Sequence, residues 1–132
     1  MDQKLLIVDD QSDIRKMLRL AMGYGKYQMF EAADGETALA LAREHKPDVI
    51  LLDVMMPGAL DGFAVCRAIK ADPALAGAYV LLLTARGQQD DYTSGDLAGA
   101  DAYMVKPFSP NRLIEVVEKR EKLTKPVSPY GR

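Results

Sequence analysis

Five residues in this chain carry side chains suited to holding a metal ion and a phosphoryl group: Asp9, Asp10, Asp53, Thr84 and Lys106. They stand at the ends of short apolar runs of the kind that forms buried strands. If these runs are parallel strands, their carboxyl ends share one edge of a sheet, where ligands bind in open α/β folds. We therefore expect carboxylate, hydroxyl and ammonium groups to converge in one pocket.

The charge of such a pocket points to a divalent metal. Crowded carboxylates repel one another, so at least one pKa would rise unless a cation compensates. Oxygen ligands alone suit Mg²⁺, which leaves positions for phosphate oxygens, and Mn²⁺ could substitute. Lys106 supplies a point charge for phosphate, and the Thr84 hydroxyl can donate to a phosphoryl oxygen. Because phosphoryl transfer depends mainly on alignment and charge neutralisation, Asp53 is the best candidate nucleophile.

Apolar runs alternate with segments of helical periodicity along the chain. The expected strands cover residues 5–8, 27–32, 49–52, 79–83 and 102–105. The expected helices cover residues 12–22, a segment after Asp34 and Gly35, residues 63–70 and 89–97, and a last segment opening at Ser109 or Pro110. We expect Ser12 and Asp13 to cap the first helix. This alternation predicts a parallel sheet with helices on both faces and right-handed crossovers.

The composition fits one folded domain. Of the 132 residues, 48% are hydrophobic, and the formal net charge is -2. That charge offers no broad cationic surface, so we expect no direct nucleic acid binding. No apolar run approaches the length needed to cross a bilayer, so we expect a cytoplasmic domain without membrane contact. The single cysteine, Cys66, predicts core packing, and the single histidine, His45, predicts a surface position near a helix end.

Four motifs, in this order, resemble those of one known family: LLIVDD at residues 5–10, LLDVMMP at 51–57, LTA at 83–85 and GADAYMVKPF at 99–108. From about residue 4 to residue 123, the chain resembles the receiver domains of response regulators in two-component signalling. The resemblance implies a flavodoxin-like (βα)5 three-layer sandwich with five parallel strands in the order 2-1-3-4-5. It divides the chain into a receiver domain, residues 1–123, and a C-terminal tail or start of a linker, residues 124–132.

The same resemblance implies a role for each matching residue at the metal site. Asp53 would accept the phosphoryl group. Asp10 and Asp53 would bind Mg²⁺ directly, together with the backbone carbonyl of Met55, whereas Asp9 would act mainly through water. Lys106 would contact the phosphoryl group.

A second set of matching residues implies a conformational switch. Thr84 would move to bond a phosphoryl oxygen, the backbone N–H of Ala85 would assist, and the ring of Tyr103 would turn inward on activation. The Lys106–Pro107 bond matches one that is usually cis in the family.

The resemblance also implies partners. A sensor histidine kinase or a phosphotransfer protein would donate the phosphoryl group. The face made by the fourth helix, the fifth strand and the last helix would control a downstream effector domain or target protein. The protein would thus be a signalling switch that catalyses its own Mg²⁺-dependent phosphorylation and dephosphorylation.

Four features could set this chain apart within the family. Met55 and Arg86, each two residues beyond a site residue, are expected to tune the lifetime of the phosphoryl group. The loop at residues 57–62 is one residue longer than the usual family form. Asp101-Ala102 stands where the family often has a pair of Asp, which is another surface difference. Residues 88–97 contain no Lys or Arg, so a charge-paired dimer loses its ion pairs. We expect a monomer or a weak phosphorylation-dependent dimer.

Other functions fit the residues less well. A haloacid-dehalogenase-like phosphatase needs Asp-x-Asp after the first strand, but this chain has Asp9-Asp10-Gln11 there. A flavodoxin-like cofactor site needs a Gly-, Ser- or Thr-rich phosphate loop after the first strand. The acidic sequence DDQSD at residues 9–13 has the wrong charge for such a loop. A receiver that has lost phosphorylation is disfavoured because no motif residue is missing. The sequence leaves open whether the domain stands alone or belongs to a longer regulator.

Overall fold

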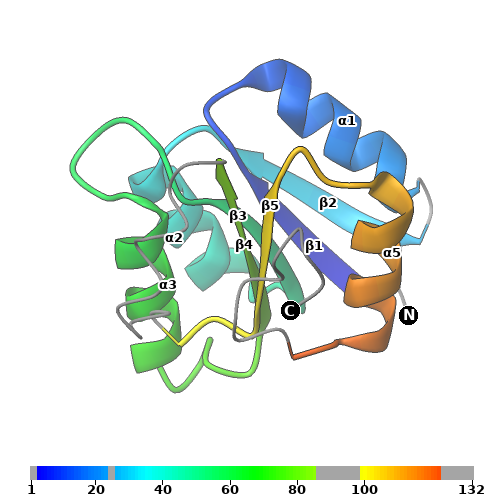
Figure 1. The fold of residues 1–132 in the computed structure, drawn as a ribbon. Helices are drawn as coiled ribbons and strands as arrows, with labels where there is room; N and C mark the ends of the chain where they lie inside the picture. The colour runs from blue at the N-terminus through cyan, green and yellow to red at the C-terminus, as the bar shows by residue number, and fades with distance from the viewer. Residues whose placement is uncertain (1–2, 24–25, 86–98, 123–132) are drawn as a thin grey trace.

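A five-stranded parallel sheet forms the centre of the protein (Figure 1). The computed structural model describes residues 3–23, 26–85 and 99–122. The strand order is β2-β1-β3-β4-β5, which confirms the flavodoxin-like fold and the order predicted from the sequence. The strands are β1 (Gln3–Val8), β2 (Tyr27–Ala32), β3 (Val49–Asp53), β4 (Tyr79–Ala85) and β5 (Ala102–Lys106).

Helices cover both faces of this sheet. Figure 1 shows α1 and α5 on one face and α2 and α3 on the other. Their bounds are α1 (Ser12–Met22), α2 (Gly35–His45), α3 (Gly62–Ala71) and α5 (Pro110–Lys119). The helix expected at residues 89–97 lies outside the described residues.

The sheet separates two hydrophobic cores because successive strand side chains point to opposite faces. Leu6, Ile50 and Leu82 belong to the core beneath α2 and α3. Leu51 and Leu81 belong to the core beneath α1 and α5. Burying one such side chain completely stabilises the fold by about 1.5–3 kcal/mol. A strand covered on both faces must be apolar at every position, which explains the unbroken apolar runs.

Polar side chains cap three of the four described helices. Asp34 accepts a hydrogen bond from the Thr37 backbone N–H at 2.7 Å, Asp61 accepts one from Ala64, and Ser109 accepts one from Arg112. These bonds satisfy backbone donors that the first helical turn leaves unpaired.

The expected cap of α1 was wrong. Gln11 occupies the N-cap position and makes no side-chain cap bond, so Ser12 and Asp13 lie inside the first turn. The backbone N–H of Gln11 donates instead to Asp9 Oδ1 at 2.9 Å. The carboxylate of Asp9 therefore organises the turn from β1 into α1, while Asp13 favours the helix through its dipole.

Several strands extend further than expected and include the polar residues that were predicted to follow them. Asp53 pairs with Leu83, and Ala85 pairs with Lys106, in the regular ladder of the sheet. Thr84 likewise lies within β4. The backbones of these residues are thus fixed by strand hydrogen bonds rather than by loop conformation.

The burial of Cys66 and His45 tests the predictions made for these two residues. Cys66 is fully buried in the core beneath α2 and α3, as predicted. His45 ends α2 as expected, but its ring is half-buried because it stacks on Phe30 with ring centroids 3.9 Å apart. Within the described ranges, no helix combines the length and apolar character needed to span a bilayer.

Candidate functional site

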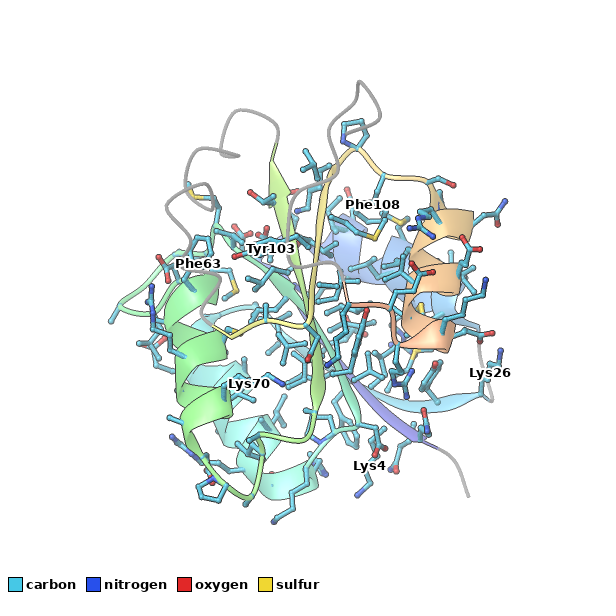
Figure 2. All side chains as sticks on the ribbon, turned by 60° about the horizontal axis from the view of Figure 1, so that its bottom comes forward. Lys4, Lys26, Phe63, Lys70, Tyr103 and Phe108 are labelled. Carbon is cyan, nitrogen blue, oxygen red and sulfur yellow. The ribbon has the colours of Figure 1, made fainter. Side chains whose placement is uncertain are left out.

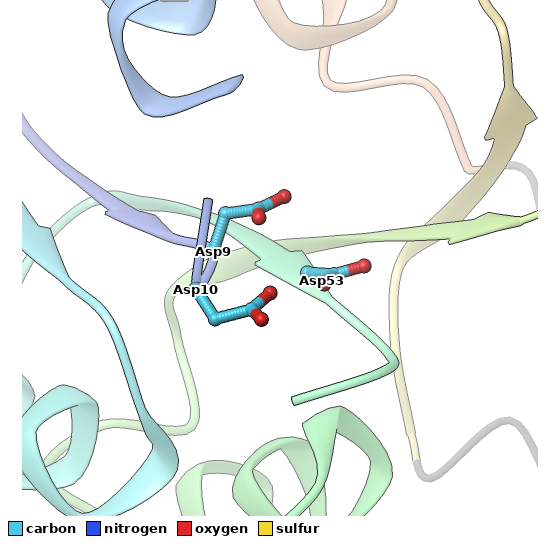
Figure 3. Close-up of side chains that lie close together, drawn as sticks. All are labelled: Asp9, Asp10 and Asp53. Carbon is cyan, nitrogen blue, oxygen red and sulfur yellow. The ribbon is translucent and has the colours of Figure 1, made fainter. Parts of the chain in front are cut away.

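Three carboxylates meet at the carboxyl ends of β1 and β3. Ligand oxygens of Asp9, Asp10 and Asp53 all lie within 4.8 Å of one another, and Figure 3 shows their carboxylates turned toward a shared space. Asp9 and Asp53 are buried, whereas Asp10 is exposed. A cluster of oxygen donors with one open side has the chemistry that Mg²⁺ prefers.

Lys106 brings a positive charge to this cluster from the end of β5. Its Nζ lies 3.1 Å from Asp9 Oδ2 and 3.2 Å from Asp53 Oδ1. Burial would lower the pKa of Lys106, but the negative charges of Asp53 and Asp9 raise it above its ordinary value. The ammonium group therefore stays charged at neutral pH and compensates part of the acidic cluster.

Asp53 has the most perturbed carboxylate of the cluster. Burial, and then the nearby charge of Asp9, raise its pKa to about 6, and Lys106 and a backbone hydrogen bond from Met55 oppose that rise. Only 5% of the residue is exposed. The ionised form is thus poorly solvated, and a bound cation would relieve this cost.

The raised pKa of Asp53 predicts how the stability of the metal-free protein depends on pH. Between about pH 4 and pH 6, the folded protein holds a proton on Asp53 that the unfolded chain, with a pKa near 3.8, releases. Because the folded state then binds more protons, the contribution of Asp53 to the free energy of unfolding falls as pH rises through this window.

Urea unfolding in EDTA would measure this contribution as the free energy of unfolding of wild type minus that of Asp53→Asn. We expect the difference to fall by on the order of 1–2 kcal/mol between about pH 4 and pH 7. A difference that stayed level or grew with pH would contradict the raised pKa.

A cavity of about 560 Å³ opens beside the acidic cluster. Met55 is 57% exposed and lies in its lining. The lining is formed by Asp10, Gln11, Asp53, Met55, Met56, Pro57 and Lys106. A small molecule, or a side chain of another protein, could therefore reach Asp53 from the solvent side.

Comparison with known proteins agrees with this geometry. Residues 5–118 match the sequence model of the response regulator receiver domain. The chain belongs to that family. Receiver domains act in two-component signalling and bind Mg²⁺ at an aspartate cluster, and the oxygen donors of Asp9, Asp10 and Asp53 fit that ion.

Relatives of this receiver domain include longer regulators. It is 45% identical over 111 residues to the probable transcriptional regulator ycf27 of Guillardia theta, covering 84% of this chain and 42% of that protein. It is 38% identical over 131 residues to the alkaline phosphatase synthesis transcriptional regulatory protein PhoP of Bacillus subtilis, covering 97% of this chain and 53% of that protein. The chain thus spans about half the length of these curated relatives.

A solved structure supports the fold assignment. A putative response regulator from Chloroflexus aurantiacus is similar with a TM-score of 0.82 and 35% identity, over 90% of this chain and 97% of that one. The similarity covers nearly the whole of both chains.

The predicted switch residues of the receiver domain lie on neighbouring strands. Thr84 and Tyr103 are each about 1% exposed, and by strand alternation both face α3. Figure 2 shows Tyr103 beside Phe63, and their ring centroids are 6.5 Å apart. Ala85 ends β4 and the Lys106–Pro107 bond is cis. Arg86 lies outside the described residues.

Sequence reasoning missed two features that shape the receiver site. Gly62 begins α3 and donates its backbone N–H to the carbonyl of Val54 at 2.9 Å, and it lies close against the backbone carbonyl of Asp53. Arg15 and Glu31 link α1 and β2 to the end of β1. The Asp61-Gly62 pair at the start of α3 was the available signal for Gly62, whereas the pairing of Arg15 with Glu31 left no periodic signal.

The Asp101-Ala102 pair was expected to be a surface difference, and this was wrong, because Ala102 is fully buried and Asp101 is largely buried. Its side chain is 12% exposed and bonds Lys70 Nζ at 3.0 Å and the Val80 backbone N–H at 2.8 Å. It also pairs with Lys122. Burial alone would raise its pKa, but these bonds hold the pKa of Asp101 below its usual range. The residue therefore fastens the start of β5 to α3 and β4.

Proposed function

We propose that this receiver domain is a phosphorylation-activated switch that accepts a phosphoryl group on Asp53 from the phosphohistidine of a sensor histidine kinase or phosphotransfer protein. The observation that carries the proposal is the buried Asp53 carboxylate held between two acidic neighbours and the Lys106 ammonium group. Such an arrangement aligns a nucleophile and supplies countercharge, which is the main requirement of phosphoryl transfer.

In the proposed transfer, a carboxylate oxygen of Asp53 forms a bond to phosphorus while the bond between phosphorus and the donor imidazole nitrogen breaks. The imidazole leaves with that electron pair. Asp10, Asp53 and the Met55 carbonyl would hold Mg²⁺ directly, and Asp9 would hold it through water. When bound, Mg²⁺, or Mn²⁺ in its place, neutralises charge on the phosphoryl oxygens. Lys106 contacts the same oxygens.

The same residues would complete the proposed cycle. Attack by water on the acyl phosphate of Asp53 releases inorganic phosphate and restores the carboxylate. Met55, exposed at the mouth of the cavity, and Arg86 would tune how long the phosphoryl group persists.

The conformational response follows from the added charge and acceptor oxygens of the phosphoryl group. Thr84 is drawn toward the phosphoryl group with help from the Ala85 N–H, and Tyr103 occupies the inward position. The response would reach a partner through β5, α5 and the segment at residues 88–97, which lies outside the described residues.

We propose that residues 1–123 form the receiver domain and that residues 124–132 are a tail or the start of a linker. The receiver domain would control an effector domain or a target protein, in line with the transcriptional regulators that the chain resembles over about half their length. We propose a monomer or weak phosphorylation-dependent dimer that makes no direct contact with nucleic acid or membrane. Exchange with a histidine kinase implies a cytoplasmic location.

Acetyl phosphate offers a direct test because it supplies the phosphoryl group without a kinase. We expect intact-mass spectrometry to show one added phosphoryl group with Mg²⁺ and none with EDTA, and peptide mapping to locate it on Asp53. Beryllofluoride should shift the amide NMR signals of Thr84 and Tyr103. Absence of modification in a protein that binds Mg²⁺, or modification at another residue, would overturn the proposal.

A further inference from the structure

Arg15 reaches from α1 to the peptide group that joins the two acidic residues at the end of β1. Its guanidinium NH1 donates to the backbone carbonyl of Asp9 at 2.8 Å. The backbone N–H of Asp9 donates to Ala32 at 3.1 Å. The carbonyl of Asp9 belongs to the same planar unit as the amide nitrogen of Asp10. Fixing this carbonyl therefore fixes the direction in which the chain enters Asp10.

Glu31 on β2 holds the guanidinium group of Arg15 in place. Glu31 Oε1 accepts from Arg15 Nε at 2.9 Å, and Oε2 accepts from Arg19 NH1 at 2.6 Å. Burial would raise the pKa of Glu31, but the bonds from Arg19 and Arg15 hold it below its usual value. Glu31 therefore stays ionised at neutral pH and anchors a side chain that is itself mostly buried.

The side chains of Asp9 and Asp10 are consequently oriented by different interactions. The side chain of Asp9 is held by the Gln11 N–H and by Lys106. The exposed Asp10 side chain makes no hydrogen bond or ion pair with a described residue, so its direction follows that of its backbone. A metal site weakens when its ligands are free to turn away, and residues that orient ligands contribute to affinity without touching the ion.

We propose that Arg15 is a positioning residue of the Mg²⁺ site, which aims Asp10 at the ion by fixing the Asp9 carbonyl, with Glu31 as its anchor. The inference rests on the proposed function, since it concerns the same ion. Charge alone gives the opposite expectation, because a guanidinium near the site repels a divalent cation. The sign of the effect therefore separates positioning from electrostatics.

The test compares Arg15→Gln with Arg19→Gln. Both variants remove one positive charge and one bond to Glu31, but Arg15→Gln also removes the bond to the Asp9 carbonyl. Mg²⁺ titrations followed by the amide signals of residues 8–12 would give the dissociation constants, and urea unfolding in EDTA would give the metal-free stabilities. We expect Arg15→Gln to weaken Mg²⁺ binding about tenfold, and Arg19→Gln to change it less than about twofold.

Equal or tighter Mg²⁺ binding by Arg15→Gln would overturn the proposal, as would equal weakening in both variants. If wild type fails to bind Mg²⁺, the proposed function fails as well, which separates the two outcomes. Should Arg15→Gln not fold, Arg15→Lys serves instead. A lysine keeps the charge but lacks the fork needed to bond Glu31 and Asp9 together, so we still expect weaker binding, and unchanged binding would overturn the proposal.

Glu31→Gln tests the anchor. If Glu31 acts through Arg15, the double variant with Arg15→Gln should bind Mg²⁺ no more weakly than Arg15→Gln alone. Additive losses would overturn the anchoring role.

Discussion

Replacing Asp53 with asparagine is expected to abolish phosphorylation by acetyl phosphate and to stabilise the metal-free protein at neutral pH. The amide of asparagine offers no carboxylate nucleophile. It also removes an ionised group whose pKa, raised to about 6 by burial and by Asp9, shows that its charge is poorly solvated. We expect the free energy of unfolding at pH 7, in EDTA, to rise by on the order of 1 kcal/mol.

Asp48→Asn is the matched control for this substitution. Asp48 accepts a hydrogen bond from the backbone N–H of Lys4 at 2.9 Å and belongs to the amino-terminal edge of the sheet, away from the acidic cluster. Intact mass and urea unfolding of both variants provide the readouts. Asp48→Asn should be phosphorylated like wild type. If Asp53→Asn still gained one phosphoryl group, Asp53 would not be the nucleophile. If Asp53→Asn lost stability, the Asp53 carboxylate would not be poorly solvated.

Gly62→Ala is expected to have the second large effect, through the backbone of Asp53. A Cβ on Gly62 would stand 2.3 Å from the carbonyl oxygen of Asp53 and 2.7 Å from the Cα of Val54. Both obstacles are backbone atoms, so β3 or α3 must move. We expect a loss of about 3 kcal/mol in the free energy of unfolding, together with slower phosphorylation because Asp53 is displaced.

Gly77→Ala separates this clash from the general effect of replacing a glycine. A Cβ on Gly77 meets nothing within 4 Å, so alanine there should leave stability within about 0.5 kcal/mol of wild type or raise it slightly. Urea unfolding measures both variants under the same conditions. Similar losses in both would show that the close approach of Gly62 to β3 is not what makes it necessary.

The sheet and the acidic cluster could be predicted because both follow from simple periodic signals. Unbroken apolar runs mark buried parallel strands, and the carboxyl ends of such strands meet at one edge. The convergence of Asp9, Asp10 and Asp53 within 4.8 Å follows from that rule. What the rule does not specify is where each strand ends, and Asp53 and Lys106 are strand residues because their backbones find ladder partners in β4.

Contacts made by long side chains were beyond sequence reasoning. Arg15 and Glu31 are sixteen positions apart on different elements, and no spacing rule joins them. Asp101-Ala102 was taken as a surface difference, yet the Asp101 side chain is largely buried. Its burial depends on two lysines, Lys70 and Lys122, that only the folded chain brings to it.

Asp53, the proposed nucleophile, and Lys106, its countercharge, lie on strands of unequal resistance to local opening. β3 is hydrogen-bonded to β1 and β4, whereas β5, among the described strands, pairs with β4 alone. Edge segments open at a lower free energy than central strands. Fraying at the end of β5 would withdraw Lys106 while Asp53 stayed fixed on β3. In that state Asp53 would lose a cation that holds its pKa down and would bind a proton more readily, and a protonated carboxyl is a poor nucleophile. The reactivity of Asp53 would then depend on local opening of the sheet edge, and it would vary while the global free energy of unfolding stayed constant.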